Sequence, residues 1–193
     1  SNKENIMINI IDIETTGLRP DYHEIIEIAI IQLDGDKVDK WSTKIAPKHI
    51  ERAHPRALEI NGYESKSWRM APSFEDVAHI IERKLSSGVV VGHNVKFDIG
   101  FVNEALFTVE RRPIKLRQID TITLAFEHLY PLGLESLSMD SIRDFVGLST
   151  RRSHTALKDA EDVLYLWRLL SRASRFTRFK LWLSNKIRGA KNG

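Results

Sequence analysis

Residues 6–17 read IMINIIDIETTG. The run from Ile6 to Ile13 is rich in β-branched side chains and apolar on both faces, which is typical of a central strand buried between two layers. Asp12 and Glu14 lie two apart at its end, so both carboxylates project from one face. Burying two like charges is costly unless a hard divalent cation binds them, so the stretch predicts a metal site. The alternative is a solvated strand end.

The rest of the chain predicts a mixed sheet. Strands are expected at 24–33 and 37–45, and the turn Asp34-Gly35-Asp36 between them favours antiparallel neighbours. Residues 46–72 are read as a loop region with a short helix near 55–60. Further elements are expected as follows: helices from Ser73 to Gly88, at 98–107, after a cap at Asp120, from Ser138 to Gly147 and at 155–170, with strands at 89–91 and 115–119. A meander followed by alternation predicts an α/β fold with helices on both sides of the sheet.

Composition limits the class of protein. The 193 residues are 42% hydrophobic and 28% charged, which suits one compact domain. The chain has no cysteine, so disulfides and thiolate metal sites are excluded and a reducing compartment, the cytoplasm, is favoured. No apolar run approaches the roughly 20 residues of a membrane span, so no membrane partner is expected.

Charge is distributed unevenly along the chain. Residues 168–193 hold eight Lys or Arg and no acid, whereas residues 1–167 carry a small acidic excess. An acidic body with a basic tail suits a carboxylate site beside a polyanion-binding surface, the alternative being a solvated basic helix. We therefore expect a body at 1–170 and a basic helical tail at 171–193, packed on or extending the same domain.

Two later segments carry candidate acids. HNVKFD, residues 93–98, follows the strand at 89–91, and Asp98 either caps the next helix or joins the first two acids beyond the strand ends. HTALKDA, residues 154–160, opens the last helix with Asp159, and Asp162 lies one turn on; spacing alone does not choose between these two acids. His154 is placed to reach a metal-bound water, unless it is a plain surface histidine.

DIETTG, HNVKFD and HTALKDA, in this order, resemble the three exonuclease motifs of the DnaQ-like DEDDh family. The likeness covers about residues 6–170, although Asn61 stands where many members have His. It implies a ribonuclease H-like fold, with a mixed five-stranded sheet of a three-strand antiparallel meander plus two further strands, flanked by helices. The spacing of His154 and Asp159 resembles the DEDDh subgroup, because the tyrosine variant needs Tyr where Thr155 stands.

The resemblance also implies roles for single residues. Asp12, Glu14, Asp98 and Asp159 would hold two divalent cations, Mg²⁺ or Mn²⁺, with His154 as general base. Asp120 is then interpreted as a helix cap and Asp162 as solvent-facing. Substrate contacts are expected beside the acids, from Thr15, Thr16, Gly17, Leu58, Asn61, Gly62, His93, Asn94, Phe97 and Arg152. For Phe97 a core role is the alternative, and for Arg152 a plain surface loop.

The resulting hypothesis is a 3′-to-5′ exonuclease that releases nucleoside 5′-monophosphates from DNA in proofreading or repair, as a DNA polymerase III epsilon-like protein. Its partners would be a nucleic acid 3′ end, with DNA favoured over RNA, and a DNA polymerase or clamp. One alternative is an RNA-trimming exoribonuclease, since recognition of a 2′-OH depends on pocket contacts that the sequence does not show. Another is a non-catalytic, polymerase-associated nucleic-acid-binding module, which would have no need of all five catalytic residues.

Overall fold

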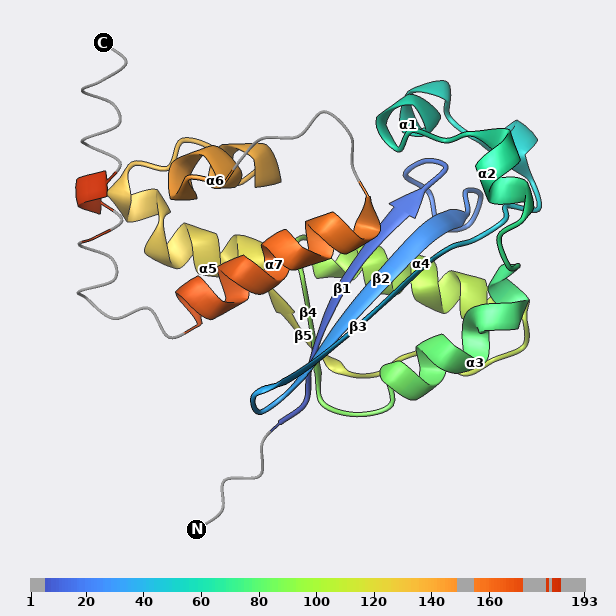
Figure 1. The fold of residues 1–193 in the computed structure, drawn as a ribbon, viewed down its shortest axis with the longest axis horizontal. Helices are drawn as coiled ribbons and strands as arrows, with labels where there is room; N and C mark the ends of the chain where they lie inside the picture. The colour runs from blue at the N-terminus through green and yellow to red at the C-terminus, as the bar shows by residue number, and fades with distance from the viewer. Residues whose placement is uncertain (1–5, 149–154, 172–179, 181, 185–193) are drawn as a thin grey trace.

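A five-stranded sheet forms the centre of the computed structural model, which describes residues 6–148, 155–171, 180 and 182–184. The strands lie in the order β3-β2-β1-β4-β5 (Figure 1). Their bounds are Ile8–Thr15 for β1, Ile25–Asp34 for β2, Lys37–Lys44 for β3, Val89–Gly92 for β4 and Arg117–Asp120 for β5.

β1 is the middle strand, as its apolar run predicts. It pairs antiparallel with β2, which pairs antiparallel with β3, and it pairs parallel with β4, which pairs parallel with β5. The register of β1 and β2 is regular up to Glu14, opposite Glu27, and shifts between Glu14 and Thr15. Such a shift bends a strand, so β1 bends directly after the two acids and ends at Thr15. The predicted meander with two further strands is confirmed.

Helices cover both faces of the sheet. Their bounds are Pro55–Ile60 for α1, Ser65–Arg69 for α2, Phe74–Lys84 for α3, Val95–Thr108 for α4, Thr121–His128 for α5, Met139–Val146 for α6 and Ala156–Leu170 for α7, with 3₁₀ turns η1 at Ile50–Arg52 and η2 at Tyr130–Leu132. Ile11 and Ile13 of β1 pack in one core cluster with α3 and α4, whereas Ile10 packs in another with α7. α5 and α6 extend the α7 side through a third cluster (Figure 1).

Local sequence explains where several helices begin. Ser73 and Asp76 form a reciprocal capping box at the start of α3, and Ser138 accepts a hydrogen bond from the backbone of Ser141 at the start of α6. Gly147 ends α6 with φ 81°. α4 begins at Val95, three residues earlier than expected, and α2, η1 and η2 were not predicted.

Two further expectations concern membrane-spanning helices and the basic tail. Among the described residues, no helix has both the length and the apolar character needed to cross a bilayer. Most of the expected tail at 171–193 lies outside the described residues. The tail and the division at residue 170 therefore stay predictions.

Candidate metal centre

Three carboxylates from two distant segments come together at the end of β1. Asp12 and Glu14 share the face of β1 that carries Ile10 and faces α7, and Asp159 lies in the first turn of α7. One carboxylate oxygen from each of Asp12, Glu14 and Asp159 can be chosen so that all three lie within 4.8 Å of one another. Asp159 is buried, whereas Asp12 and Glu14 stay partly exposed. The group is therefore open on the side of β1.

Asp98 reaches the same region from the other side of the sheet. It lies in the first turn of α4, which packs against the opposite face, and is 4% exposed. It does not belong to the group of three, but its charge helps to raise the pKa of Asp12. The N-cap position of α4 is Asn94, so Asp98 is not the capping residue that the alternative required.

Burial and mutual repulsion perturb the acids. Burial raises the pKa of Asp12 well above its usual value, and the charges of Asp98, Glu14 and Asp159 raise it further, against a lowering by Arg143. Burial, followed by the charges of Asp159 and Glu27, raises the pKa of Glu14 to about 8. Burial likewise raises the pKa of Asp98. Clustered carboxylates that repel one another and offer only oxygen donors fit Mg²⁺ or Mn²⁺.

Arg143 of α6 lies beside the cluster and was missed by the sequence analysis. Its side chain is 1% exposed and donates hydrogen bonds to Asp159, to Asp162 at 2.7 Å and to Asp140 at 3.0 Å. The expectation that Asp162 faces solvent is wrong, because Asp162 is 5% exposed and paired with this arginine. The only sequence signal was a cation between apolar residues of a short amphipathic helix. Arg143 does not close the cluster, because Asp12 and Glu14 keep their exposed side.

The turn after β1 is held by hydrogen bonds. The Thr16 hydroxyl accepts from the backbone N–H of Glu24 at 2.9 Å, and the Thr15 hydroxyl donates to the carbonyl of Gly17 at 2.6 Å. The Asn61 side chain, at the end of α1, donates to the carbonyl of Thr15 at 2.9 Å. Two groups of expected substrate residues, Thr15 to Gly17 and Leu58 to Gly62, therefore lie next to each other beside the acids.

Two expected substrate residues of the HNVKFD segment, His93 and Phe97, contact other parts of the protein. Both ring nitrogens of His93 are within hydrogen-bonding distance of protein atoms, the Thr121 hydroxyl at 3.0 Å and the Leu137 carbonyl at 3.1 Å, and burial lowers its pKa. His93 therefore ties β4 to α5 and to the segment before α6. Phe97 is half-buried and packs on Phe101 with ring centroids 4.8 Å apart, so part of its ring belongs to the core and part stays exposed.

Two expected residues cannot be placed. His154 and Arg152 lie outside the described residues, so their roles stay predictions. Thr155, which directly follows His154, is the N-cap residue of α7, the helix that carries Asp159.

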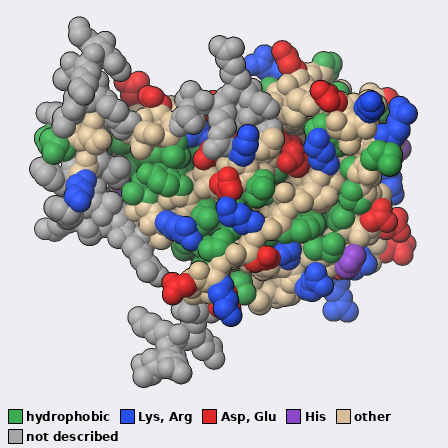
Figure 2. All heavy atoms as spheres, viewed as in Figure 1, with side chains coloured by type: hydrophobic (Ala, Val, Ile, Leu, Met, Phe, Trp, Pro, Cys, Tyr) green, Lys and Arg blue, Asp and Glu red, His purple; other side chains and the backbone are tan. Residues whose placement is uncertain are grey.

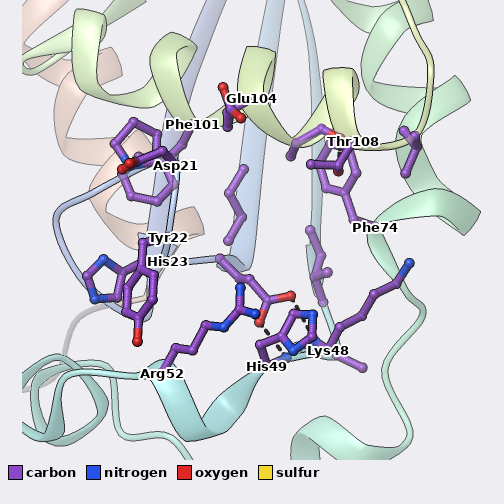
Figure 3. Close-up of a pocket in the computed structure, with 17 residues that line it drawn as sticks. Asp21, Tyr22, His23, Lys48, His49, Arg52, Phe74, Phe101, Glu104 and Thr108 are labelled. Atoms are coloured by element: carbon purple, nitrogen blue, oxygen red, sulfur yellow. Dashed lines mark hydrogen bonds between the residues drawn. The ribbon is translucent and has the colours of Figure 1, made fainter.

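A hollow of about 250 Å³ lies apart from the acids. It is lined by α4, by the loop between β1 and β2 and by residues that follow β3; Tyr22, His23, Arg52 and Phe101 are among its labelled side chains (Figure 3). The guanidinium of Arg52 lies over the Tyr22 ring, 5.4 Å from its centroid. None of the four acids lines this hollow, so it is not the metal centre.

The order of the strands and the placement of the helices define a ribonuclease H-like fold. Among solved structures, Escherichia coli exonuclease I in complex with a dT13 oligonucleotide superposes with a TM-score of 0.75, over 86% of this chain and 41% of that chain. The identity is 18%, so this likeness concerns the fold.

Sequence comparison identifies the family. The model of the exonuclease family RNase_T matches residues 10–167, and the chain belongs to this family. DNA polymerase III PolC-type of Thermotoga petrophila is 35% identical over 162 residues, which are 83% of this chain and 11% of that protein. DNA polymerase III subunit epsilon of Aquifex aeolicus is 30% identical over 152 residues, which are 78% of this chain and 73% of that protein. The chain thus spans about a tenth of the PolC-type relatives.

Proposed function

We propose that the chain is a two-metal-dependent 3′-to-5′ exonuclease that releases nucleoside 5′-monophosphates from DNA. One observation carries the proposal: in a member of an exonuclease family, Asp12, Glu14 and Asp159 come from distant segments and bring carboxylate oxygens within 4.8 Å of one another. The names of the relatives, which are DNA polymerase III proteins, support DNA as the substrate.

Each acid has a place in the proposed centre. Asp12, Glu14, Asp98 and Asp159 would hold two divalent cations, which when bound neutralise the charge that gathers on the phosphate oxygens and activate the attacking water. Asp12 is the acid on which the other charges converge, because Asp98, Glu14 and Asp159 each raise its pKa. Four carboxylates against two divalent cations balance formally. His154 would accept the proton of the water, because an imidazole ordinarily exchanges a proton near neutral pH.

The terminal nucleotide would lie against the turn after β1. The Thr15 to Gly17 backbone, with Asn61 bound to it, would position the sugar and phosphate, and the exposed side of Phe97 would contact the base. On the face drawn in Figure 2, basic and acidic side chains of the described residues are interspersed. Our candidates for contacts with the upstream strand are the basic residues of the tail at 171–193, which holds no acid, together with Arg152.

We also propose a partner and a cellular compartment for the protein. The names of its relatives favour association with a DNA polymerase, and we assign the chain to the cytoplasm, supported by the absence of cysteine. An exoribonuclease and a non-catalytic module are the competing assignments, and both are outcomes of the following experiment.

The experiment offers 5′-labelled single-stranded DNA, a duplex with a mismatched 3′ end and RNA of the same sequence, each with Mg²⁺, Mn²⁺ or EDTA. We expect a ladder that shortens from the 3′ end of DNA, release of nucleoside 5′-monophosphate, and no product in EDTA. The Asp12→Asn variant is the matched control for contaminating nuclease. Faster degradation of RNA would make the protein an exoribonuclease, and no metal-dependent product on any substrate would make it a binding module.

A further inference from the structure

Arg143 connects three acids of different exposure. Its Nε donates to Oδ2 of Asp162 at 2.7 Å, its Nη1 donates to Oδ1 of Asp140 at 3.0 Å, and its Nη2 donates to Oδ1 of Asp159. The side chains of Arg143, Asp162 and Asp159 are 1%, 6% and 10% exposed, whereas that of Asp140 is 64% exposed. The guanidinium is therefore held inside the protein, between α6 and α7.

The contact of Arg143 with Asp162 differs in its effect from the contact with Asp159. A guanidinium is planar and presents its donors in a fixed fork, so the contact with Asp162 fixes the direction of the remaining N–H groups. One of these groups binds Asp159. Asp162 lies three residues after Asp159 on α7, so both carboxylates face the same arginine from one side of that helix. Rotation of the Asp159 carboxylate is thereby restricted.

We propose that Arg143 is a positioning residue that orients the Asp159 carboxylate toward Asp12 and Glu14 and so sets the affinity of the site for divalent cations. The inference rests on the proposed metal centre. Groups that hydrogen-bond a metal-binding side chain orient it, and their removal typically lowers metal affinity or activity about 10- to 100-fold. In this role Arg143 would position a metal-binding side chain without binding the cation itself, through its hydrogen bond to Asp159.

Two other roles of Arg143 would change metal affinity differently when Arg143 is removed. If Arg143 competed with a cation for Asp159, its removal would tighten metal binding. If Arg143 only filled space between α6 and α7, its removal would lower stability and leave metal affinity unchanged. Metal affinity of the substrate-free protein, compared with stability, separates these roles.

The test compares Arg143→Met and Arg143→Lys with Asp140→Asn as the matched control. Asp140→Asn alters another charged contact of the same guanidinium, at its exposed end, and leaves Asp159 untouched. Mn²⁺ binding to the substrate-free protein is measured by calorimetry, thermal unfolding in EDTA monitors the fold, and turnover is measured against Mn²⁺ concentration.

We expect Arg143→Met to raise the Mn²⁺ dissociation constant about 10- to 100-fold, with most of the turnover restored at saturating Mn²⁺. Arg143→Lys should fall between Met and wild type, because it keeps the charge without the fork, and Asp140→Asn should bind as wild type. Should Arg143→Met fail to fold, Arg143→Met/Asp162→Leu removes the buried ion pair between these two residues as a whole and is expected to show the same loss of affinity.

Unchanged or tighter Mn²⁺ binding in folded variants at position 143 would overturn the proposal, as would a wild-type protein that does not bind Mn²⁺. A wild-type protein that binds Mn²⁺ but degrades no nucleic acid would refute the exonuclease function only. In that case the binding comparison still decides the role of Arg143.

Discussion

The carboxylate of Asp120 accepts a hydrogen bond from the backbone N–H of Asn94, with a donor–acceptor distance of 3.0 Å. It also accepts from the backbone of Val95 at 3.1 Å and from that of Ile122 at 2.9 Å, the last as the predicted cap of α5. Asn94 has φ 64°, in the left-handed region that asparagine tolerates better than most residues. Asp120 at the end of β5 therefore fixes the turn at which α4, the helix of Asp98, begins.

Replacing Asp120 is expected to weaken both fold and site. Asp120→Ala removes a charged acceptor from three backbone N–H groups, so the free energy of unfolding should fall by about 1–3 kcal/mol. Mn²⁺ affinity should fall as well, because the first turn of α4 loses its anchor. Ser73→Ala, which breaks the cap of α3, is the control and should cost about 1 kcal/mol without altering Mn²⁺ affinity. Equal Mn²⁺ affinity in both variants would contradict the link between Asp120 and Asp98.

The raised pKa of Glu14 makes stability and metal binding depend on pH in opposite directions. Because the pKa of folded Glu14 is about 8 against a usual 4.5, the folded state binds more protons than the unfolded state between these values. The metal-free protein should therefore lose stability as pH rises from about 4.5 to 8. Mn²⁺ must displace the proton, so its affinity should rise over the same range.

Calorimetric titration with Mn²⁺ at pH 6 and pH 8 measures the change in Mn²⁺ affinity. Unfolding in EDTA at the same two pH values measures the change in stability. Glu14→Gln has no proton to lose and should flatten the dependence of stability on pH. Metal affinity that is equal at pH 6 and pH 8 would contradict the proposed competition between proton and cation.

Gly17 is expected to matter because of His23. A Cβ added at Gly17 would overlap the imidazole of His23, whose Nδ1 accepts a hydrogen bond from the backbone of Arg19 at 3.1 Å. Gly17→Ala should therefore shift the turn beside the acids and lower kcat/KM about 10- to 100-fold, with an unchanged circular dichroism spectrum.

The double variant Gly17→Ala/His23→Ala removes the obstructing ring and should recover most of the lost kcat/KM. If the double variant were as slow as Gly17→Ala alone, the cause would lie at Gly17 itself, for example in a direct substrate contact, and the steric account would be wrong.

His154 is expected to serve turnover rather than metal binding. Loss of a general base typically costs about 10²–10⁴-fold, so His154→Ala should lower kcat by that factor near neutral pH and leave the Mn²⁺ dissociation constant as in wild type. Single-turnover degradation of labelled DNA gives the rate, and calorimetry gives the affinity. An unchanged rate would remove His154 from the role of base.

Much of the fold could be predicted because local signals agreed with the global arrangement. The apolar run before Asp12 marked the central strand, the turn at Asp34 to Asp36 marked the hairpin, and Ser73, Asp120 and Ser138 marked helix starts. α2 escaped prediction because its five residues, SKSWR, show no helical period, and it is held by a long-range contact, from the Trp68 indole N–H to the Ile26 carbonyl at 2.7 Å.

The site was predicted less completely, because its pairings also depend on long-range contacts. The spacing of Asp12 and Glu14 on a strand reveals a shared face, but nothing local to α7 distinguishes Asp159 from Asp162. The difference lies in position: Asp159 contributes to the group with Asp12 and Glu14, and Asp162 pairs with Arg143. Arg143 is far from Asp159 and Asp162 in sequence. The ring of His93 likewise contacts distant residues, the Thr121 hydroxyl and the Leu137 carbonyl. Such pairings depend on tertiary contacts that no window of sequence contains.

The central claim is that acids distant in sequence bind a pair of divalent cations. Calorimetric titration of the protein with Mn²⁺, in the presence of a nucleoside 5′-monophosphate, tests it most directly. We predict two Mn²⁺ ions bound per chain in the wild-type protein and loss of this binding in Asp12→Asn, with the variant still folded. Absence of Mn²⁺ binding in the wild type, or binding that Asp12→Asn leaves unchanged, would contradict the claim.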